Sequence, residues 1–206
     1  MFKQSIYLCR SVLKLVKNYI AFTMLQASLV NTNQQLQQIH DLNQKNLKTH
    51  LSDSEQREQG FLSWSYSLQL LQQMNDLASS VIVTDNDHLA GYALTALPES
   101  RKFHTELDLM FKGFEELEYR GKPIWTYRFY CMGQICIAKE YRGMGIVPML
   151  YNKHKENYSN KYDFILTEIS MRNLRSIKAH EKIGFETIYH HRDHLDEWAV
   201  VIWDWK

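Results

Sequence analysis

The sequence TYRFYCMGQICIAKEYRGMGIVPML, residues 126–150, decides the fold class, because a strand pattern changes there into a helix pattern across two glycines. Residues 126–138 are rich in aromatic and β-branched side chains, which is typical of a β-strand. Gly143 and Gly145 follow, and Pro148 falls in the first turn of the next helix, where its missing N–H costs no hydrogen bond. A strand that passes through a glycine turn into a helix N-terminus offers unpaired N–H groups and the positive end of a helix dipole. The segment is therefore a candidate anion site.

This motif alone does not distinguish an anion site from a tight turn. It lacks the GK[ST] of a P-loop and does not fit the GxGxxG dinucleotide fingerprint. Arg142, which directly precedes the glycines, could add a cationic clamp.

A second block, NLRSIKAHEKIGF at residues 173–185, makes the interpretation more specific. Asn173 begins a helix, and Gly184 provides its C-terminal stop. Together the two blocks resemble the GNAT superfamily of N-acetyltransferases. The first resembles the family's pyrophosphate loop, Q/R-x-x-G-x-G/A, and the second its N-x-x-(S/A)-…-(Y/H)-E-K-x-G-F helix.

The rest of the chain gives alternating strands and helices. Two strand patterns separated by Asn86-Asp87 predict a hairpin. The resemblance and this order imply an α/β (α+β) fold: a mixed, mostly antiparallel sheet of about seven strands flanked by helices, with an N-terminal helical extension. The expected strands are 24–30, 79–85, 88–97, 126–138, 163–171, 185–191 and 197–205. The expected helices are 32–47, 62–77, a segment around 107–114, one after residue 146, and 173–183.

Residues 1–23 are expected to be an amphipathic extension, and residues 24–206 the GNAT domain. Basic side chains such as Lys14 interrupt every apolar run of the extension, which argues against a signal peptide. The segment could lie on a membrane surface, dock on its own domain or pack on a partner subunit in a homodimer, or it could reflect an over-long start before Met24.

The composition limits the kinds of partner and the cellular location that are expected. The 24 basic and 23 acidic side chains give a net charge of +1, so nucleic acid is not the expected partner. No run approaches ~18 apolar residues, so no membrane span is expected. The three cysteines form no CxxC pair, which favours a reducing compartment and a cytoplasmic location.

The resemblance implies acetyl-CoA as the cosubstrate and assigns its contacts. Arg142 matches the Q/R position of the cofactor loop. The backbone N–H groups of Gly143, Met144, Gly145, Ile146 and Val147 would bind the diphosphate, although Val147 departs from the family's Gly/Ala. The backbone around Ile135, Cys136 and Ile137 would pair with the pantetheine amides like an added strand. Asn173, with Ser176 one turn later, would lie near the thioester.

Family offsets also suggest an acid–base pair for direct aminolysis, with Glu168 as base and His180 as acid. Each residue has an alternative. Glu168 could be structural, and His180 could be a core histidine bonded to the backbone.

Three weaker patterns remain. His190, His191 and His194 could suggest zinc, but His190 and His194 would lie ~13 Å apart on a strand, so no metal is expected. An acidic stretch could attract a cationic acceptor or be a solvated helix face. Aromatic side chains near the 126–138 strand could line the acceptor pocket or form core. The acidic residues are Glu106, Asp108, Glu115, Glu116 and Glu118, and the aromatic residues are Trp125, Tyr127, Phe129 and Tyr130.

Two functions are consistent with these patterns. The first is an acyltransferase that moves the acetyl group of acetyl-CoA to a primary amine of a small molecule or peptide. The second is a non-catalytic acyl-CoA-binding or sensing module on the same fold, which the Val147-Pro148 departure favours slightly.

Overall fold

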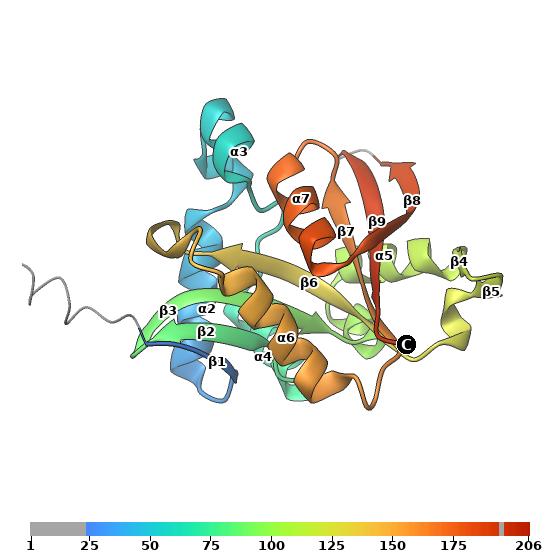
Figure 1. Cartoon of the computed structure of the whole chain (residues 1–206), viewed down its shortest axis with the longest axis horizontal. Coiled ribbons are helices and arrows are strands. Elements are labelled where there is room, and N and C mark those ends of the chain that lie inside the picture. The colour runs from blue at the N-terminus through green and yellow to red at the C-terminus, as the bar shows by residue number, and fades with distance from the viewer. Residues whose placement is uncertain (1–23, 194–195) are drawn as a thin grey trace, which may run out of the picture.

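A computed structural model describes residues 24–193 and 196–206. Its centre is a seven-stranded sheet in the order β1-β2-β3-β6-β7-β9-β8 (Figure 1). Within this described sheet, β6 and β7 run parallel and every other neighbouring pair is antiparallel. The mixed, mostly antiparallel sheet is therefore confirmed. Its strands are β1 (Leu25–Leu29), β2 (Val81–Asp85), β3 (His88–Ala96), β6 (Phe129–Ile137), β7 (Phe164–Ser170), β8 (Glu186–Arg192) and β9 (Glu197–Asp204).

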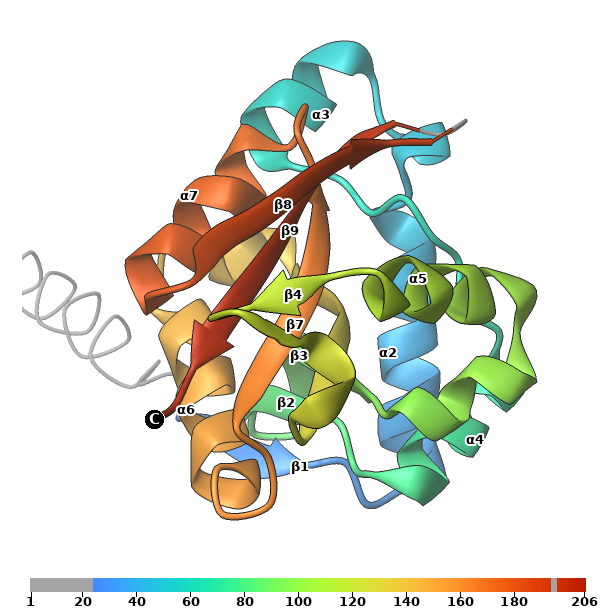
Figure 2. The same ribbon diagram turned by 90° about the vertical axis from the view of Figure 1, so that its right-hand side faces the viewer.

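Helices cover both faces of the sheet (Figure 2). One face carries α2 (Asn33–Lys45), α4 (Leu68–Leu77) and α5 (Thr105–Glu115), and the other carries α6 (Ile146–Tyr158) and α7 (Leu174–Ile183). A further helix, α3 (Asp53–Gln59), contacts α7. The short elements are η1 (Lys48–His50), η2 (Pro98–Phe103), η3 (Ile124–Thr126), η4 (Lys139–Tyr141) and the hairpin of β4 (Glu118–Tyr119) with β5 (Lys122–Pro123).

The inner strand β7 shows how the two cores arise. Phe164 and Leu166 pack under α2, α4 and α5, whereas Ile165 and Ile169 pack under α6 and α7. Because side chains alternate along a strand, an uninterrupted apolar run is buried on both faces. The same alternation directs Glu168 toward the α5 face.

The predicted helix at 62–77 is wrong at its start. Ser52 and Glu55 form a capping box and begin α3, a helix that the sequence analysis does not predict. Residues 61–66 are extended, and α4 begins only after Ser67, whose side chain accepts a hydrogen bond from the Leu70 N–H. The Ser67 cap therefore sets the start of α4.

A buried polar network holds this extended segment against β6. Two β6 residues, Gly133 and Gln134, lie in a register shift of the β3–β6 ladder. The Gln134 side chain accepts hydrogen bonds from Asn43 at 2.7 Å and from the Tyr92 hydroxyl at 2.6 Å, and it donates one to the Trp64 carbonyl at 3.0 Å. Satisfied buried amides of this kind fix a single local geometry.

The predicted extension at 1–23 and His194 lie outside the described residues. Within the described part, no helix is long and apolar enough to cross a membrane.

Candidate active site

The candidate site is a cleft between the two parallel strands. The β6–β7 ladder ends at the pair Cys131 and Leu166, and beyond it the strands diverge, as Figure 1 shows. One further bond, from the Thr167 hydroxyl to the Met132 carbonyl at 2.8 Å, spans the start of the opening. The resulting cavity has a volume of about 950 Å³ and is lined by both strands, the 142–148 segment, α5 and α7.

The open edge of β6 presents backbone groups to this cleft. The Ala138 N–H donates to Ala90 of β3 at 2.9 Å, so alternation directs the Cys136 backbone toward β3 as well. The backbones of Ile135 and Ile137 then face the cleft. Of the three predicted residues, Cys136 therefore contributes no free backbone edge, and burial of its side chain raises the pKa of the thiol to about 12.

The glycine loop leads directly into α6. Gly143 has φ 82° and Gly145 has φ 78°, both in the left-handed region that favours glycine. The Met144 N–H bonds to the Tyr141 carbonyl at 3.4 Å and closes the turn. Within the described chain, no partner is found for the N–H groups of Gly143, Gly145, Ile146 and Val147. The loop therefore offers four donors and the positive end of the α6 dipole, and Met144 is not among the donors.

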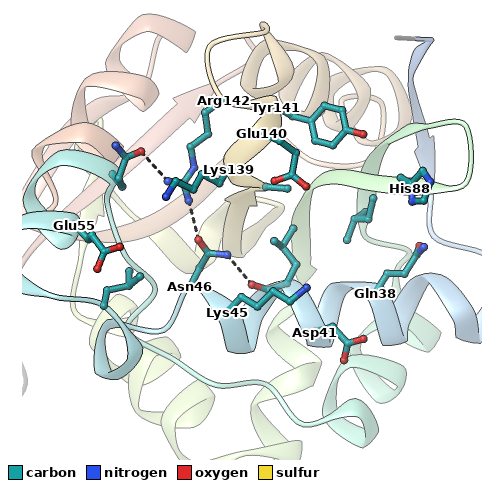
Figure 3. Close-up of a pocket in the computed structure, with 15 residues that line it drawn as sticks. Gln38, Asp41, Lys45, Asn46, Glu55, His88, Lys139, Glu140, Tyr141 and Arg142 are labelled. Carbon is teal, nitrogen blue, oxygen red and sulfur yellow. Dashed lines mark hydrogen bonds between the residues drawn. The ribbon is translucent and has the colours of Figure 1, made fainter. Parts of the chain in front are cut away.

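Arg142 is placed differently from the expected clamp. Its guanidinium donates to the Ile137 carbonyl at 3.1 Å, Gln59 at 2.9 Å and Asn46 at 2.7 Å. Figure 3 shows the side chain pointing toward Asn46, and both residues line a second cavity. These three partners are neutral, so the guanidinium charge is not compensated and can attract an anion at the adjacent loop. The side chain also joins β6 to α3 and to Asn46 at the end of α2.

Asn173 caps α7, as the sequence indicated. Its Oδ1 accepts from the Ser176 N–H at 3.2 Å, and its Nδ2 donates to the Phe61 carbonyl at 3.0 Å. The predicted residues Asn173 and Ser176 both line the cleft. The amide thus joins α7 to the extended segment 61–66, which forms one wall of the cavity.

His180 has the surroundings of a core histidine. It is 2% exposed, and its Nδ1 lies 2.8 Å from the Ser176 carbonyl, so that nitrogen carries the proton. Its Nε2 lies 2.6 Å from the hydroxyl of buried Tyr151. Burial lowers the pKa of His180 to about 4, so the ring is neutral at neutral pH. These surroundings match the core-histidine alternative, and His180 also lines the cleft, so its role as an acid stays a prediction.

Glu168 faces the cleft and has a partner that sequence reasoning missed. Its Oε1 lies 2.9 Å from Nε2 of His191, with the side chains 17% and 30% exposed. This hydrogen bond, with the nearby charge of Asp193, raises the pKa of His191. The two residues lie on β7 and β8, with β9 between them, so no local pattern in the sequence could have paired them.

The acidic stretch contains acids that are paired with basic side chains and one acid that lines the cleft. Arg101 contacts Asp108 and Glu115 at 2.7 Å each, and Lys112 contacts Asp108 at 2.8 Å, so these acids form a solvated, paired face. Glu106 instead lines the cleft.

The aromatic side chains of 125–130 belong to the core and its edge, and none lines the cleft, which agrees with the core alternative. Trp64 and Trp198 line it instead. Among the described residues, no cluster of three His, Cys, Asp or Glu side chains could hold a metal ion.

Comparisons with known proteins agree with this geometry. The sequence model of the acetyltransferase (GNAT) family matches residues 36–185. No curated protein sequence matches the chain.

Solved structures share the fold at low sequence identity. The ribosomal-protein-S18-alanine N-acetyltransferase from Escherichia coli has 12% identity and a TM-score of 0.59, covering 88% of this chain and 94% of its own. The NatC complex bound to Gag peptide and CoA has 14% identity and a TM-score of 0.59, with coverage of 88% and 99%. The protein yncA from Salmonella typhimurium, with its cofactor acetyl-CoA, has 11% identity and a TM-score of 0.56, with coverage of 88% and 94%.

Proposed function

The chain belongs to the GNAT family of acetyltransferases, and we propose that it transfers the acetyl group of acetyl-CoA to a primary amine within the β6–β7 cleft. One observation carries this proposal. The same cavity is lined by a loop with four unpaired N–H groups, by the open edge of β6, and by the carboxylate of Glu168.

The cofactor half would bind acetyl-CoA mainly through the backbone. The N–H groups of Gly143, Gly145, Ile146 and Val147 are suited to the diphosphate, and the nearby charge of Arg142 adds to the attraction. The backbone of Ile135 and the N–H of Ile137, whose carbonyl already accepts from Arg142, would pair with the pantetheine amides. A similar fold has been solved with CoA in the NatC complex and with acetyl-CoA in yncA, which supports this placement.

Glu168 would accept the proton that the amine must lose. The amine nitrogen then bonds to the thioester carbonyl carbon and the C–S bond breaks. The second proton, which the nitrogen gives up as the amide forms, passes to the departing thiolate and yields the thiol. His191 holds the Glu168 carboxylate through its Nε2 at 2.9 Å, leaving the second carboxylate oxygen for the amine. Because a thiol has an ordinary pKa near ~8.5, the thiolate can depart without a strong acid. The neutral His180 is therefore not needed as the donor.

The acceptor would be an amine of a small molecule or a peptide. The printed names of two similar structures, the S18-alanine N-acetyltransferase and the NatC complex with its Gag peptide, support this class without selecting between the two.

The alternative is an acyl-CoA-binding module without catalysis. One feature favours it: Pro148 removes a donor from the first turn of α6, directly after the branched Val147.

A thiol-release assay with acetyl-CoA and a panel of amines distinguishes the two functions. Release that depends on both the amine and Glu168 supports the transferase. Tight acetyl-CoA binding with no release for any amine supports the binding module.

A further inference from the structure

The helix α5 presents one face to the cleft. Leu107, Phe111 and Phe114 form its buried face. Asp108, Lys112 and Glu115 form the salt-bridged outer face described above. The residues of its third face line the 950 Å³ cavity at spacings of three and four, and they are Glu106, Leu109, Met110 and Gly113. Met110 also packs against the core and accepts a hydrogen bond from the Cys131 thiol at 3.7 Å, whereas Leu109 is 51% exposed.

Gly113 has no structural role that explains it. It lies in the last turn of the helix, which ends at Glu115, and its φ is not in the left-handed region. A Cβ added there would meet nothing within 4 Å. Glycine inside a helix costs roughly 0.5–1 kcal/mol relative to alanine, so this position keeps open a space that the chain itself does not use.

Most basic side chains of the cleft lie on α7, and its acidic side chains lie on other elements. The α7 side carries the bases Arg175, Lys178 and Lys182, which suit an anionic coenzyme. The acids of the cavity are Glu106 on α5, Glu168 on β7 with its partner His191, and Asp193 after β8. Its apolar lining includes Leu109, Met110, Trp64 and Trp198. An acidic, apolar wall of this kind is complementary to a cation that carries an apolar group.

We infer that the cleft face of α5 is the acceptor subsite, and that it takes a primary ammonium bearing an apolar group for which Gly113 leaves room. This inference rests on the proposed function and names its acceptor class. The ammonium lies toward Glu168, and the apolar group lies against Leu109 and Gly113. A free alkyl or aralkyl amine and a peptide N-terminus with an apolar first side chain share this chemistry.

The test compares Gly113→Ala and Gly113→Phe with Glu116→Phe, a control on the exposed end of the same helix. Calorimetry on CoA-saturated protein measures binding of phenethylamine, of a tetrapeptide with N-terminal Phe, and of glutamate. Thiol release measures turnover of the same compounds.

We expect wild type to bind phenethylamine, the peptide or both, and to bind glutamate at least tenfold more weakly. Gly113→Phe should weaken that binding at least tenfold, and Gly113→Ala should weaken it less while leaving the melting temperature unchanged or raised. Binding of acetyl-CoA should not change, and Glu116→Phe should behave as wild type. The probe that binds identifies the source of the amine.

The inference would be overturned by equal binding of glutamate, or by a Gly113→Phe variant that binds phenethylamine and the peptide as wild type does. Absence of amine binding in wild type would overturn it as well. If the amines bind with this Gly113 dependence but no thiol is released, the inference stands and the proposed transfer fails.

Discussion

The two halves of the cleft are built in different ways. The cofactor half consists of backbone groups on one continuous segment, from the open edge of β6 through the loop to the first turn of α6. The acceptor half consists of side chains from α5, β7, β8 and β9, brought together only by the fold. Backbone sites leave short sequence signatures, whereas sites made of converging side chains do not. Substitutions in the two halves should therefore separate binding of acetyl-CoA from catalysis and from selection of the amine.

The largest loss of acetyl transfer is expected from Glu168→Gln. It removes the proton acceptor but keeps the size of the side chain, so kcat/KM for an amine should fall about 10²–10³-fold. The affinity for acetyl-CoA should remain unchanged, because Glu168 lies in the acceptor half. Stopped-flow thiol release and calorimetry measure the two quantities.

Glu181→Gln is the matched control, since Glu181 is exposed on α7 outside the cleft. Equal losses of activity in both variants would remove Glu168 from the proposed mechanism.

A smaller effect is expected at His191, which acts through Glu168. His191→Ala should lower kcat about tenfold, and His191→Gln, which can still donate to the carboxylate, should recover part of the loss. An NMR titration tests the contact directly. The pKa of His191 is raised mainly by Glu168, so Glu168→Gln should lower it.

The sign of the pH dependence follows from that raised pKa. The Glu168–His191 contact stabilises the fold most at low pH, where His191 is charged, and this stabilisation is lost as pH rises through the folded pKa. A His191 pKa that does not change in Glu168→Gln would show that the contact is absent in solution.

His180 should behave in the opposite way. Its folded pKa of about 4 lies below the ordinary value, so the unfolded chain binds a proton first as pH falls. Stability should decrease from pH ~6.5 toward 4, and His180→Phe should reduce this decrease. Buried His154, whose pKa is also about 4, should retain its own share of it. Urea titrations from pH 4 to 8 measure the difference.

Activity between pH 7 and 9.5 should show no falling limb that depends on His180. Such a limb, lost in His180→Phe, would support the acid role.

Removal of residues 1–23 is expected to change the affinity for acetyl-CoA least. A chain that begins at Met24 keeps every residue of the described cleft, so acetyl-CoA affinity should stay within about twofold. Loss of binding in a folded, truncated protein would show that the N-terminal segment takes part in the site.

The comparison also explains how much could be predicted from the sequence. The strand order along the chain, the Asn86-Asp87 hairpin, the glycine loop and the Asn173 cap could be predicted because each depends on nearby residues. The start of α4 could not be predicted from apolar spacing, because the Ser67 cap decided it.

The acceptor half could be predicted only in part. Glu168 followed from the family resemblance, but its contact with His191 depends on the β7-β9-β8 order. Burial supports the core-histidine alternative for His180, because a neutral imidazole is favoured where the charged form would lose its hydration. The side chain of Arg142 contacts α2 and α3, which are distant in sequence.

The central claim is that the 142–147 loop binds the diphosphate of acetyl-CoA, and a matched glycine pair tests it most directly. Gly145 and Gly121 have φ of 78° and 71°, and a Cβ at either position would meet nothing within 4 Å. Gly145→Asp and Gly121→Asp therefore carry similar backbone strain, but only the first places a carboxylate at the loop. Calorimetry should give a Kd for acetyl-CoA at least tenfold higher in Gly145→Asp and unchanged in Gly121→Asp. An unchanged Kd in a folded Gly145→Asp protein would contradict the assignment of the loop.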